Sequence, residues 1–137
     1  MRRCSALLVA LVIGGCGATQ SQTATTPASR VEQVNGTKQV VLSAQAANHL
    51  GIQTKPVRAA GHLTVVPYAA VLYAADGSAS TYTNPTRLTY VREPIRIDHI
   101  SGSQVFLAQG PPAGTSVVTV GEDELLGAEN GVAGESH

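Results

Sequence analysis

Residues 63–83 read LTVVPYAAVLYAADGSASTYT and carry the clearest structural signals in the chain. Their apolar run predicts an extended strand over residues 63–74, interrupted at Pro67, where the missing N–H suits a sheet edge or a change of pairing partner. Asp76-Gly77 predicts a hairpin turn, because both residues tolerate the backbone conformations of tight turns, and a further strand over residues 79–83 follows it. This part of the sequence therefore predicts antiparallel β structure.

Further strands are predicted on both sides of this hairpin, over residues 39–42, 51–57, 87–100, 104–108 and 116–120. In the longest of them the alternation of apolar residues reverses between Tyr90 and Ile95. One extra residue moves all following side chains to the other face of a sheet, so the reversal predicts a β-bulge around Arg92-Glu93-Pro94.

One short helix is predicted over Ala44–Leu50, since Ser43 is a good N-cap and Gly51 would end the helix. Residues 122–126 are expected to form a final helical turn. The expected fold class is therefore mostly β: a small antiparallel β-roll or barrel-like domain of about seven or eight strands with one short α-helix.

The length and composition of the chain restrict its class. Its 137 residues leave room for one domain. Nine Lys plus Arg balance nine Asp plus Glu, so the chain lacks the positive surplus that binds a phosphate backbone, and no nucleic-acid partner is expected. Both cysteines lie in the first 16 residues, so the rest of the chain can form neither an internal disulfide nor a thiolate zinc site.

The first residues are typical of a secretion signal. Arg2 and Arg3 precede an apolar run over residues 6–13, which is shorter than the roughly 20 residues that a membrane-spanning helix needs. Ile13-Gly14-Gly15-Cys16 resembles the bacterial lipobox, in which small residues precede a Cys that is lipidated. The resemblance implies a signal peptide over residues 1–15 and a lipid anchor, palmitate included, on Cys16 at the extracytoplasmic face of the bacterial cell membrane. The alternative is a secreted product with an unused Cys.

The remaining chain divides into three parts. Residues 16–36 are rich in Thr, Gln, Ser and Ala and are expected to form a flexible tether, with Asn35-Gly36 as a turn near its end. The folded domain is expected over residues 37–126. Residues 127–137 contain three Gly and no apolar periodicity, so they are expected to form a frayed tail.

Several short segments occur in a characteristic order: residues 41–57, VVPYAAVL at 65–72, Asp76-Gly77 with Tyr82 behind it, VREPIRI at 91–97, GPPAGTSVV at 110–118 with Gly121 following, and GAENGV at 127–132. This order resembles the periplasmic adaptor subunits, or membrane fusion proteins (HlyD-like), of RND-type efflux pumps. The resemblance covers the membrane-proximal domain of those adaptors.

The chain departs from the family at one place. In a full adaptor a lipoyl-like domain, an α-helical hairpin and a β-barrel separate the segments that here end at Val57 and begin at Val65. The resemblance therefore implies the membrane-proximal domain alone: a lipid-anchored accessory protein that takes part in efflux and contacts an inner-membrane transporter without bridging to an outer-membrane channel. The alternative is a free-standing envelope lipoprotein that binds a small ligand or a cell-wall component in a groove beside Pro94.

The sequence predicts no enzyme, cofactor or metal site. The four His residues, at positions 49, 62, 99 and 137, show no pair at metal-ligand spacing, and His49 suits the C-terminus of the predicted helix. Asp98 and His99 are neighbours on a predicted strand, so they are expected to point to opposite faces. Arg92, Arg96 and Asp98 alternate along one strand face, which is either a solvated surface or a docking patch for a transporter.

Overall fold

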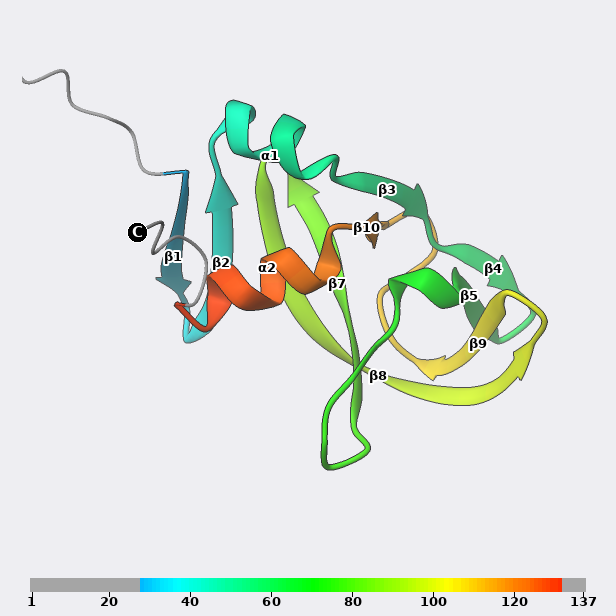
Figure 1. Ribbon diagram of the computed structural model, residues 1–137. Coiled ribbons are helices and arrows are strands. Elements are labelled where there is room, and N and C mark those ends of the chain that lie inside the picture. The colour runs from blue at the N-terminus through cyan, green and yellow to red at the C-terminus, as the bar shows by residue number, and fades with distance from the viewer. Residues whose placement is uncertain (1–27, 132–137) are drawn as a thin grey trace, which may run out of the picture.

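A computed structural model gives the structure of residues 28–131, which form a mostly β domain (Figure 1). Within this part of the chain there are ten strands: β1 (Ser29–Val34), β2 (Thr37–Leu42), β3 (Gln53–Pro56), β4 (Arg58–Ala60), β5 (Leu63–Pro67), β6 (Leu72–Tyr73), β7 (Ala79–Thr86), β8 (Thr89–Ser101), β9 (Gln104–Gln109) and β10 (Ser116–Val120). The helices are α1 (Ala44–Leu50) and α2 (Glu122–Glu129), and a 3₁₀ turn covers Tyr68–Ala70. The predicted antiparallel, barrel-like fold is confirmed, and the helical turn expected over residues 122–126 forms the first part of α2.

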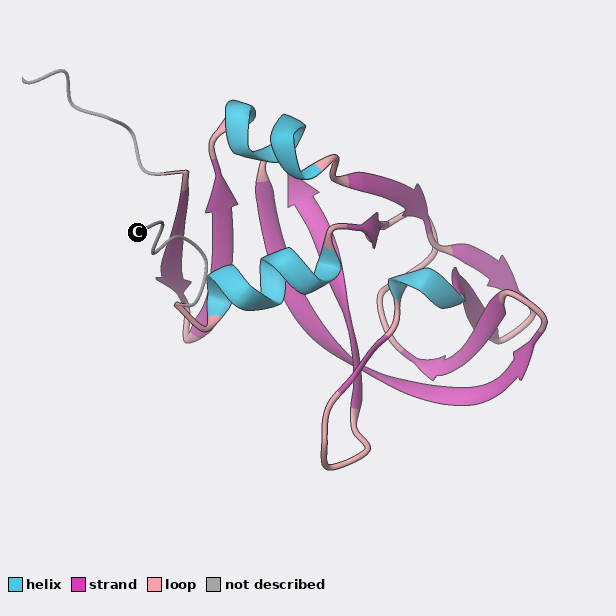
Figure 2. Ribbon diagram, viewed as in Figure 1, coloured by secondary structure: helices cyan, strands magenta, loops and turns pink. Residues whose placement is uncertain are grey.

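The strands pair antiparallel and join into one sheet that curls almost into a barrel (Figure 2). One path runs in the order β3-β10-β7-β8-β9-β5-β4, while β2 joins β8 and carries β1 at its outer edge. Strand β8 is 13 residues long and pairs with β7 and β2 over its first half and with β9 over its second. It thereby links the broad part of the sheet to a curled end, which consists of β4, β5, β9 and the second half of β8.

Two turn signals of the sequence form the turns that they predict. Asn35 and Gly36 have positive φ angles of 51° and 80° and join β1 to β2, with Val34 paired to Thr37. Asp76 accepts hydrogen bonds from the backbone N–H and the hydroxyl of Ser78, which closes the hairpin between β6 and β7. Both turn predictions are confirmed.

The predicted helix α1 is confirmed together with its ends. The Ser43 hydroxyl oxygen accepts a hydrogen bond from the backbone N–H of Ala46 at 3.1 Å. Gly51 has the left-handed conformation, with a φ of 63°, and donates its N–H to the last carbonyls of the helix. His49 lies in the last turn, as expected.

The core consists of two apolar clusters, one on each part of the sheet. On the broad part, Leu125 and Ala128 of α2 pack against side chains of β2, β7 and β8, namely Val40, Leu42, Tyr82 and Tyr90. The other cluster fills the curled end and consists of Val57, Val66, Ala70, Ile95, Val105, Leu107 and Val117. Helix α2 therefore covers only the broad part of the sheet, as Figure 1 shows.

The folded part of the chain extends further at both ends than the sequence predicts. The tether is expected to reach residue 36, but Ser29–Val34 pair with β2 along the whole of β1. The tail is expected to begin at residue 127, but α2 continues to Glu129, whose side chain is buried. Both boundaries are wrong, because backbone pairing stabilises the polar strand and packing of Ala128 stabilises the end of the helix.

The irregular positions of β8 lie beyond the predicted bulge. The pairing of β8 with β7 is continuous over residues 91–95, so Arg92-Glu93-Pro94 contains no extra residue. The register shifts instead against β9, between Arg96 and Ile97 and between Ile97 and His99. The predicted bulge at residues 92–94 is therefore wrong. The alternation reverses because Tyr90 belongs to the cluster under α2 and Ile95 to the cluster of the curled end, so the two side chains point to opposite faces of a regular part of the strand.

Residues 1–27 and 132–137 lie outside the part of the chain that the structure describes, and with them the signal peptide, Cys16 and most of the predicted tether. The leader and the lipidation of Cys16 stay predictions. Among residues 28–131, no helix combines the length and the apolar character that crossing a membrane requires.

Candidate functional site

A buried carboxylate at the end of α2 gathers polar side chains over the sheet. The side chain of Glu129 is only 5% exposed. Arg92 on β8 donates to this carboxylate from Nε, at 3.3 and 3.1 Å, and from Nη2, at 2.9 Å. Tyr82 on β7 donates its hydroxyl to Oε2 of Glu129 at 2.5 Å. The Glu129 carboxylate therefore accepts hydrogen bonds from two side chains, Arg92 and Tyr82, that lie far from it in the sequence.

These contacts shift the pKa values of all three groups. Burial raises the pKa of Glu129, but hydrogen bonds from Arg92 and Tyr82 and the positive charges of Arg92 and Lys38 outweigh it, so the pKa lies below its usual range. Burial, and then the bond to Glu129, raise the pKa of the Tyr82 phenol. The hydrogen bond to Glu129 also raises the pKa of Arg92. Near neutral pH the site therefore holds a carboxylate, a guanidinium and a protonated phenol.

The register of the sheet brings these side chains to one face. Tyr82 pairs with Arg92 and Ser80 pairs with Pro94, and alternate residues of a strand share a face. Gln39 on β2 pairs with Val91, so the same register continued by one residue places Lys38 beside Arg92. Helix α2 covers the apolar part of this face, and the polar part continues beyond its last turn.

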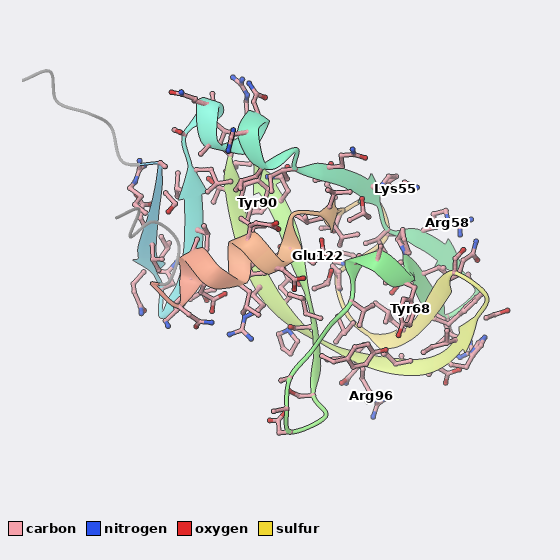
Figure 3. All side chains as sticks on the ribbon, in the orientation of Figure 1. Lys55, Arg58, Tyr68, Tyr90, Arg96 and Glu122 are labelled. Carbon is pink, nitrogen blue, oxygen red and sulfur yellow. The ribbon has the colours of Figure 1, made fainter. Side chains whose placement is uncertain are left out.

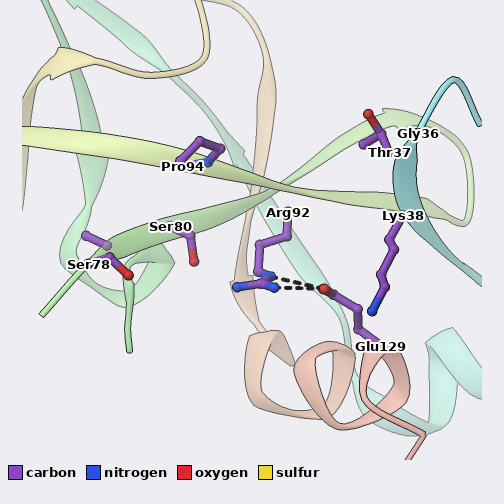
Figure 4. Close-up of a pocket in the computed structure, with 9 residues that line it drawn as sticks. Gly36, Thr37, Lys38, Ser78, Ser80, Arg92, Pro94 and Glu129 are labelled. Atoms are coloured by element: carbon purple, nitrogen blue, oxygen red, sulfur yellow. Dashed lines mark hydrogen bonds and ion pairs between the residues drawn. The ribbon is translucent and has the colours of Figure 1, made fainter. Parts of the chain in front are cut away.

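A groove of about 410 Å³ lies on this polar part (Figure 4). Its lining comes from the β1–β2 turn, the β6–β7 hairpin, β8 and α2, and includes Lys38, Ser78, Ser80, Arg92, Pro94 and Glu129. Figure 4 shows two nitrogens of Arg92 facing Glu129 and the third pointing toward Ser80. A groove therefore lies beside Pro94, as the ligand-binding alternative requires, although no bulge forms it.

A smaller hollow of about 260 Å³ lies at the curled end and is lined by Lys55, Pro56, Arg58, Pro67, Ser103 and Gln104. Figure 3 shows Lys55 and Arg58 on consecutive strands at this end of the domain. In the part of the chain that the structure covers, neither cation makes an ion pair. These two side chains lack the fixed geometry that Glu129 gives to Arg92.

Asp98 and His99 form a pair, which the sequence does not predict. The Nδ1 of His99 lies 2.7 Å from Oδ2 of Asp98, and both side chains are about half exposed. The ring of His99 also stacks on Phe106, with centroids 4.3 Å apart. The expectation that the two neighbours point to opposite faces is wrong, because the register of β8 is irregular around Ile97.

The charged row predicted along β8 is divided among separate contacts. Arg92 is bonded to Glu129 and Asp98 to His99, while Arg96 lies where β8 enters the curled end (Figure 3). Arg92 and Asp98 therefore have different partners and do not share a contact. Between residues 28 and 131, no three His, Cys, Asp or Glu side chains are grouped as metal ligands.

Sequence reasoning missed Tyr82 and Glu129 as site residues. Leu125 and Ala128 are spaced to share one apolar face of a helix. This spacing could have predicted that the helix continues past residue 126 and includes Glu129. No local pattern connects Glu129 with Arg92, because they are 37 residues apart and meet only in the folded protein.

Comparisons with protein-family models, with curated proteins and with solved structures found no match for this chain. The likeness to efflux adaptors therefore rests on the segments of the sequence itself, and the function of the groove has to be inferred from its geometry.

Proposed function

We propose that the protein is a non-enzymatic, lipid-anchored accessory protein that docks onto an envelope transporter through its β domain. The segments that resemble the membrane-proximal domain of RND efflux adaptors fall within one antiparallel sheet: residues 65–72 reach from β5 to β6, residues 91–97 lie on β8, and residues 110–118 lead into β10. A single folded unit made from these segments is what the resemblance requires, and it supports the proposal.

The closed hairpin between β4 and β5 carries the proposal. Ala60 pairs with Leu63, and Gly61, with a φ of 62°, forms the turn between them together with His62. In the family that the sequence resembles, further domains enter at this point. Because the chain turns back at once, the sheet is completed without those domains, which favours docking onto a transporter over bridging two membranes.

The proposed anchor, Cys16, precedes the domain in the sequence. Its acylation would hold the protein at the extracytoplasmic face of the bacterial cell membrane, where a stable hold needs more than one acyl chain. Since β1 begins at Ser29, the domain follows the anchor closely. This arrangement would bring the domain to the extracytoplasmic part of an inner-membrane transporter.

Site-specific photo-crosslinking in membranes of the producing cells tests the proposal. Photoreactive residues replace Tyr68 or Ile100, both 48% exposed, and exposed Gln45 on α1 serves as the matched control position. We expect crosslinks from Tyr68 or Ile100 to an integral membrane transporter and few from Gln45. In parallel, Cys16→Ser should move the protein from the membrane fraction to the soluble fraction.

Two results would refute the proposal. Acylated protein that crosslinks to no transporter from any position excludes docking. Wild-type protein that carries no acyl chain in a mass spectrum excludes the anchor on Cys16.

The groove beside Pro94 favours a second function, the binding of a small envelope ligand or a cell-wall component. Its volume of about 410 Å³ falls in the range of ligand sites, roughly 300–1,000 Å³, and polar groups converge on it from separate elements. A thermal-shift screen of envelope metabolites and wall fragments tests this function. We expect at least one compound to raise the Tm, and a screen without any stabilising compound would exclude the function.

A further inference from the structure

We propose that the groove beside Pro94 binds the phosphate group of a small ligand, with Arg92 and Lys38 as the main donors. The inference rests on the second proposed function, ligand binding in this groove, and names the chemistry of the ligand. It depends on how Arg92 is held, on the charge of the groove and on which donors remain free.

Arg92 is positioned before any ligand binds. Its Nε and Nη2 bond to Glu129, which is itself bonded to Tyr82 and only 5% exposed. A guanidinium fixed in this way loses little conformational freedom when it binds an anion. Its Nη1 makes no hydrogen bond to residues 28–131 and points toward Ser80 in Figure 4.

The groove has a positive balance of charge. Lys38 and Arg92 contribute two positive charges and Glu129 one negative charge, so one positive charge remains among the lining residues. Lys38 makes no ion pair in the described part of the chain, and its side chain extends toward Glu129 (Figure 4). Figure 4 shows the Glu129 carboxylate between the two cations, so an anion bound at Nη1 of Arg92 would contact that guanidinium directly and feel the charge of Lys38 from across Glu129.

A phosphate suits the free donors better than a carboxylate does. Glu129 occupies the Nε–Nη2 fork of Arg92, and the second planar fork, Nη1–Nη2, stays open to an anion. The donors that remain are the N–H groups of Nη1 and one N–H of Nη2 on Arg92, the Ser80 hydroxyl and, on the other side of the Glu129 carboxylate, the ammonium group of Lys38. These donors lie in different directions around the groove. The tetrahedral oxygens of a phosphate can accept from several directions at once.

An NMR titration of the full chain in maltoside micelles tests the inference. Inorganic phosphate is added at low salt while the Nε–H of Arg92 and the backbone N–H groups of Gly36, Ser78 and Ser80 are followed. We expect saturable shifts, and binding about fivefold weaker in Lys38→Gln, which removes an exposed cation. Lys55→Gln removes a cation from the smaller hollow and, as the matched control, should change the affinity less than about twofold.

Sodium acetate at equal ionic strength distinguishes phosphate from anions in general. The inference is overturned if acetate binds as tightly, if Lys38→Gln and Lys55→Gln have equal effects, or if the shifts do not saturate. If inorganic phosphate does not bind but a neutral compound from the thermal-shift screen binds the groove, the groove binds a ligand that is not a phosphate, and only the proposed chemistry of the ligand is refuted. If nothing binds, the second proposed function is excluded as well.

Two further titrations identify the source of the phosphate. Glycerol phosphate represents a soluble phosphate ester, and phosphatidylglycerol mixed into the micelles represents a lipid headgroup. A response of the same N–H groups to glycerol phosphate supports a soluble ligand. A response to phosphatidylglycerol alone supports a headgroup, and no response to either probe or to inorganic phosphate overturns the inference.

Discussion

Replacing Glu129 by Gln tests whether the end of α2 is part of the fold. Glu129→Gln keeps the size of a side chain that is 5% exposed but removes the charge that accepts hydrogen bonds from Arg92 and Tyr82. A hydrogen bond to a charged group contributes about 1.5–3 kcal/mol and a neutral one about 0.5–1.5 kcal/mol. Because the Arg92 side chain is 40% exposed, water replaces part of the lost interaction. We therefore expect the free energy of unfolding to fall by about 1–2 kcal/mol.

Thermal and urea unfolding, followed by circular dichroism, measure this change. In a domain of this size about 1 kcal/mol shifts the Tm by roughly 4–8 °C, so we expect the Tm to fall by about 5–10 °C. Glu124→Gln is the matched control, because Glu124 lies on the same helix, is exposed and loses the same charge. It should change the free energy of unfolding by less than about 0.5 kcal/mol.

The effect of Glu129→Gln should also depend on pH. Burial raises the pKa of Glu129, but its contacts with Arg92 and Tyr82 lower it more, so the folded pKa lies below the unfolded one. Such a group contributes stability that is fully present above the unfolded pKa, roughly 4.3, and that is lost as the pH falls through the folded pKa. The difference between wild type and Glu129→Gln should therefore be constant near neutral pH and shrink below about pH 4.

Equal Tm values for Glu129→Gln and Glu124→Gln would refute this reasoning. A difference that persists unchanged at about pH 3 would refute it as well. Equal Tm values would mean that the contacts of Glu129 add nothing to stability, whereas a loss that does not depend on pH would mean that they stabilise the fold without help from the charge of the carboxylate.

Three further sets of variants test single elements by urea or thermal unfolding. Gly121→Ala should lower the free energy of unfolding by about 2 kcal/mol, because Gly121 has a φ of 94° and a Cβ there would collide with Ile52. Gly127 has open space around it, so Gly127→Ala should raise the free energy of unfolding by about 0.5–1 kcal/mol. The opposite order of these two variants would contradict the position of α2. Ser43→Ala should lower the free energy of unfolding by about 1 kcal/mol, since it removes the cap of α1, and a loss as large in Ser43→Asp, which keeps a capping oxygen, would exclude the cap as the cause. Burial and the charges of Asp123 and Glu124 raise the pKa of Glu122, so its ionised form destabilises the fold. Glu122→Gln should therefore raise the Tm by a few degrees near neutral pH and have little effect below about pH 4, where Glu122 is protonated. A Glu122→Gln variant with a lower Tm than wild type near neutral pH would contradict this assignment.

The features that the sequence predicts correctly depend on short-range backbone preferences. Asn35-Gly36 forms a hairpin turn because both residues adopt positive φ angles at little cost. Ser43 and Gly51 define the ends of α1 because one supplies a hydroxyl acceptor and the other a left-handed conformation. Each of these signals acts within a few residues, so no knowledge of distant contacts is needed to recognise it.

The features that the sequence does not predict depend on distant partners. Strand β1 is mostly polar, and its apolar Val31 and Val34 are both exposed, so composition alone favours a tether there. Its pairing with β2 uses the backbone, which every sequence provides. The groove likewise takes Lys38, Arg92 and Glu129 from separate elements, so no motif precedes it.

The proposed docking and the proposed phosphate binding are assigned to different parts of the domain, so we expect that each can be removed without the other. Ile100 lies on the same strand as Arg92 but at the tip of the curled end, up to roughly 25 Å away at about 3.3 Å per residue. Substitutions separated by more than about 7–10 Å act independently when they share no partner. Lys38→Gln should therefore leave crosslinking from position 100 unchanged, and Ile100→Ser should leave the phosphate affinity unchanged. If one of these substitutions abolishes both activities, the groove and the curled end serve a single partner, and phosphate recognition is a step of docking itself.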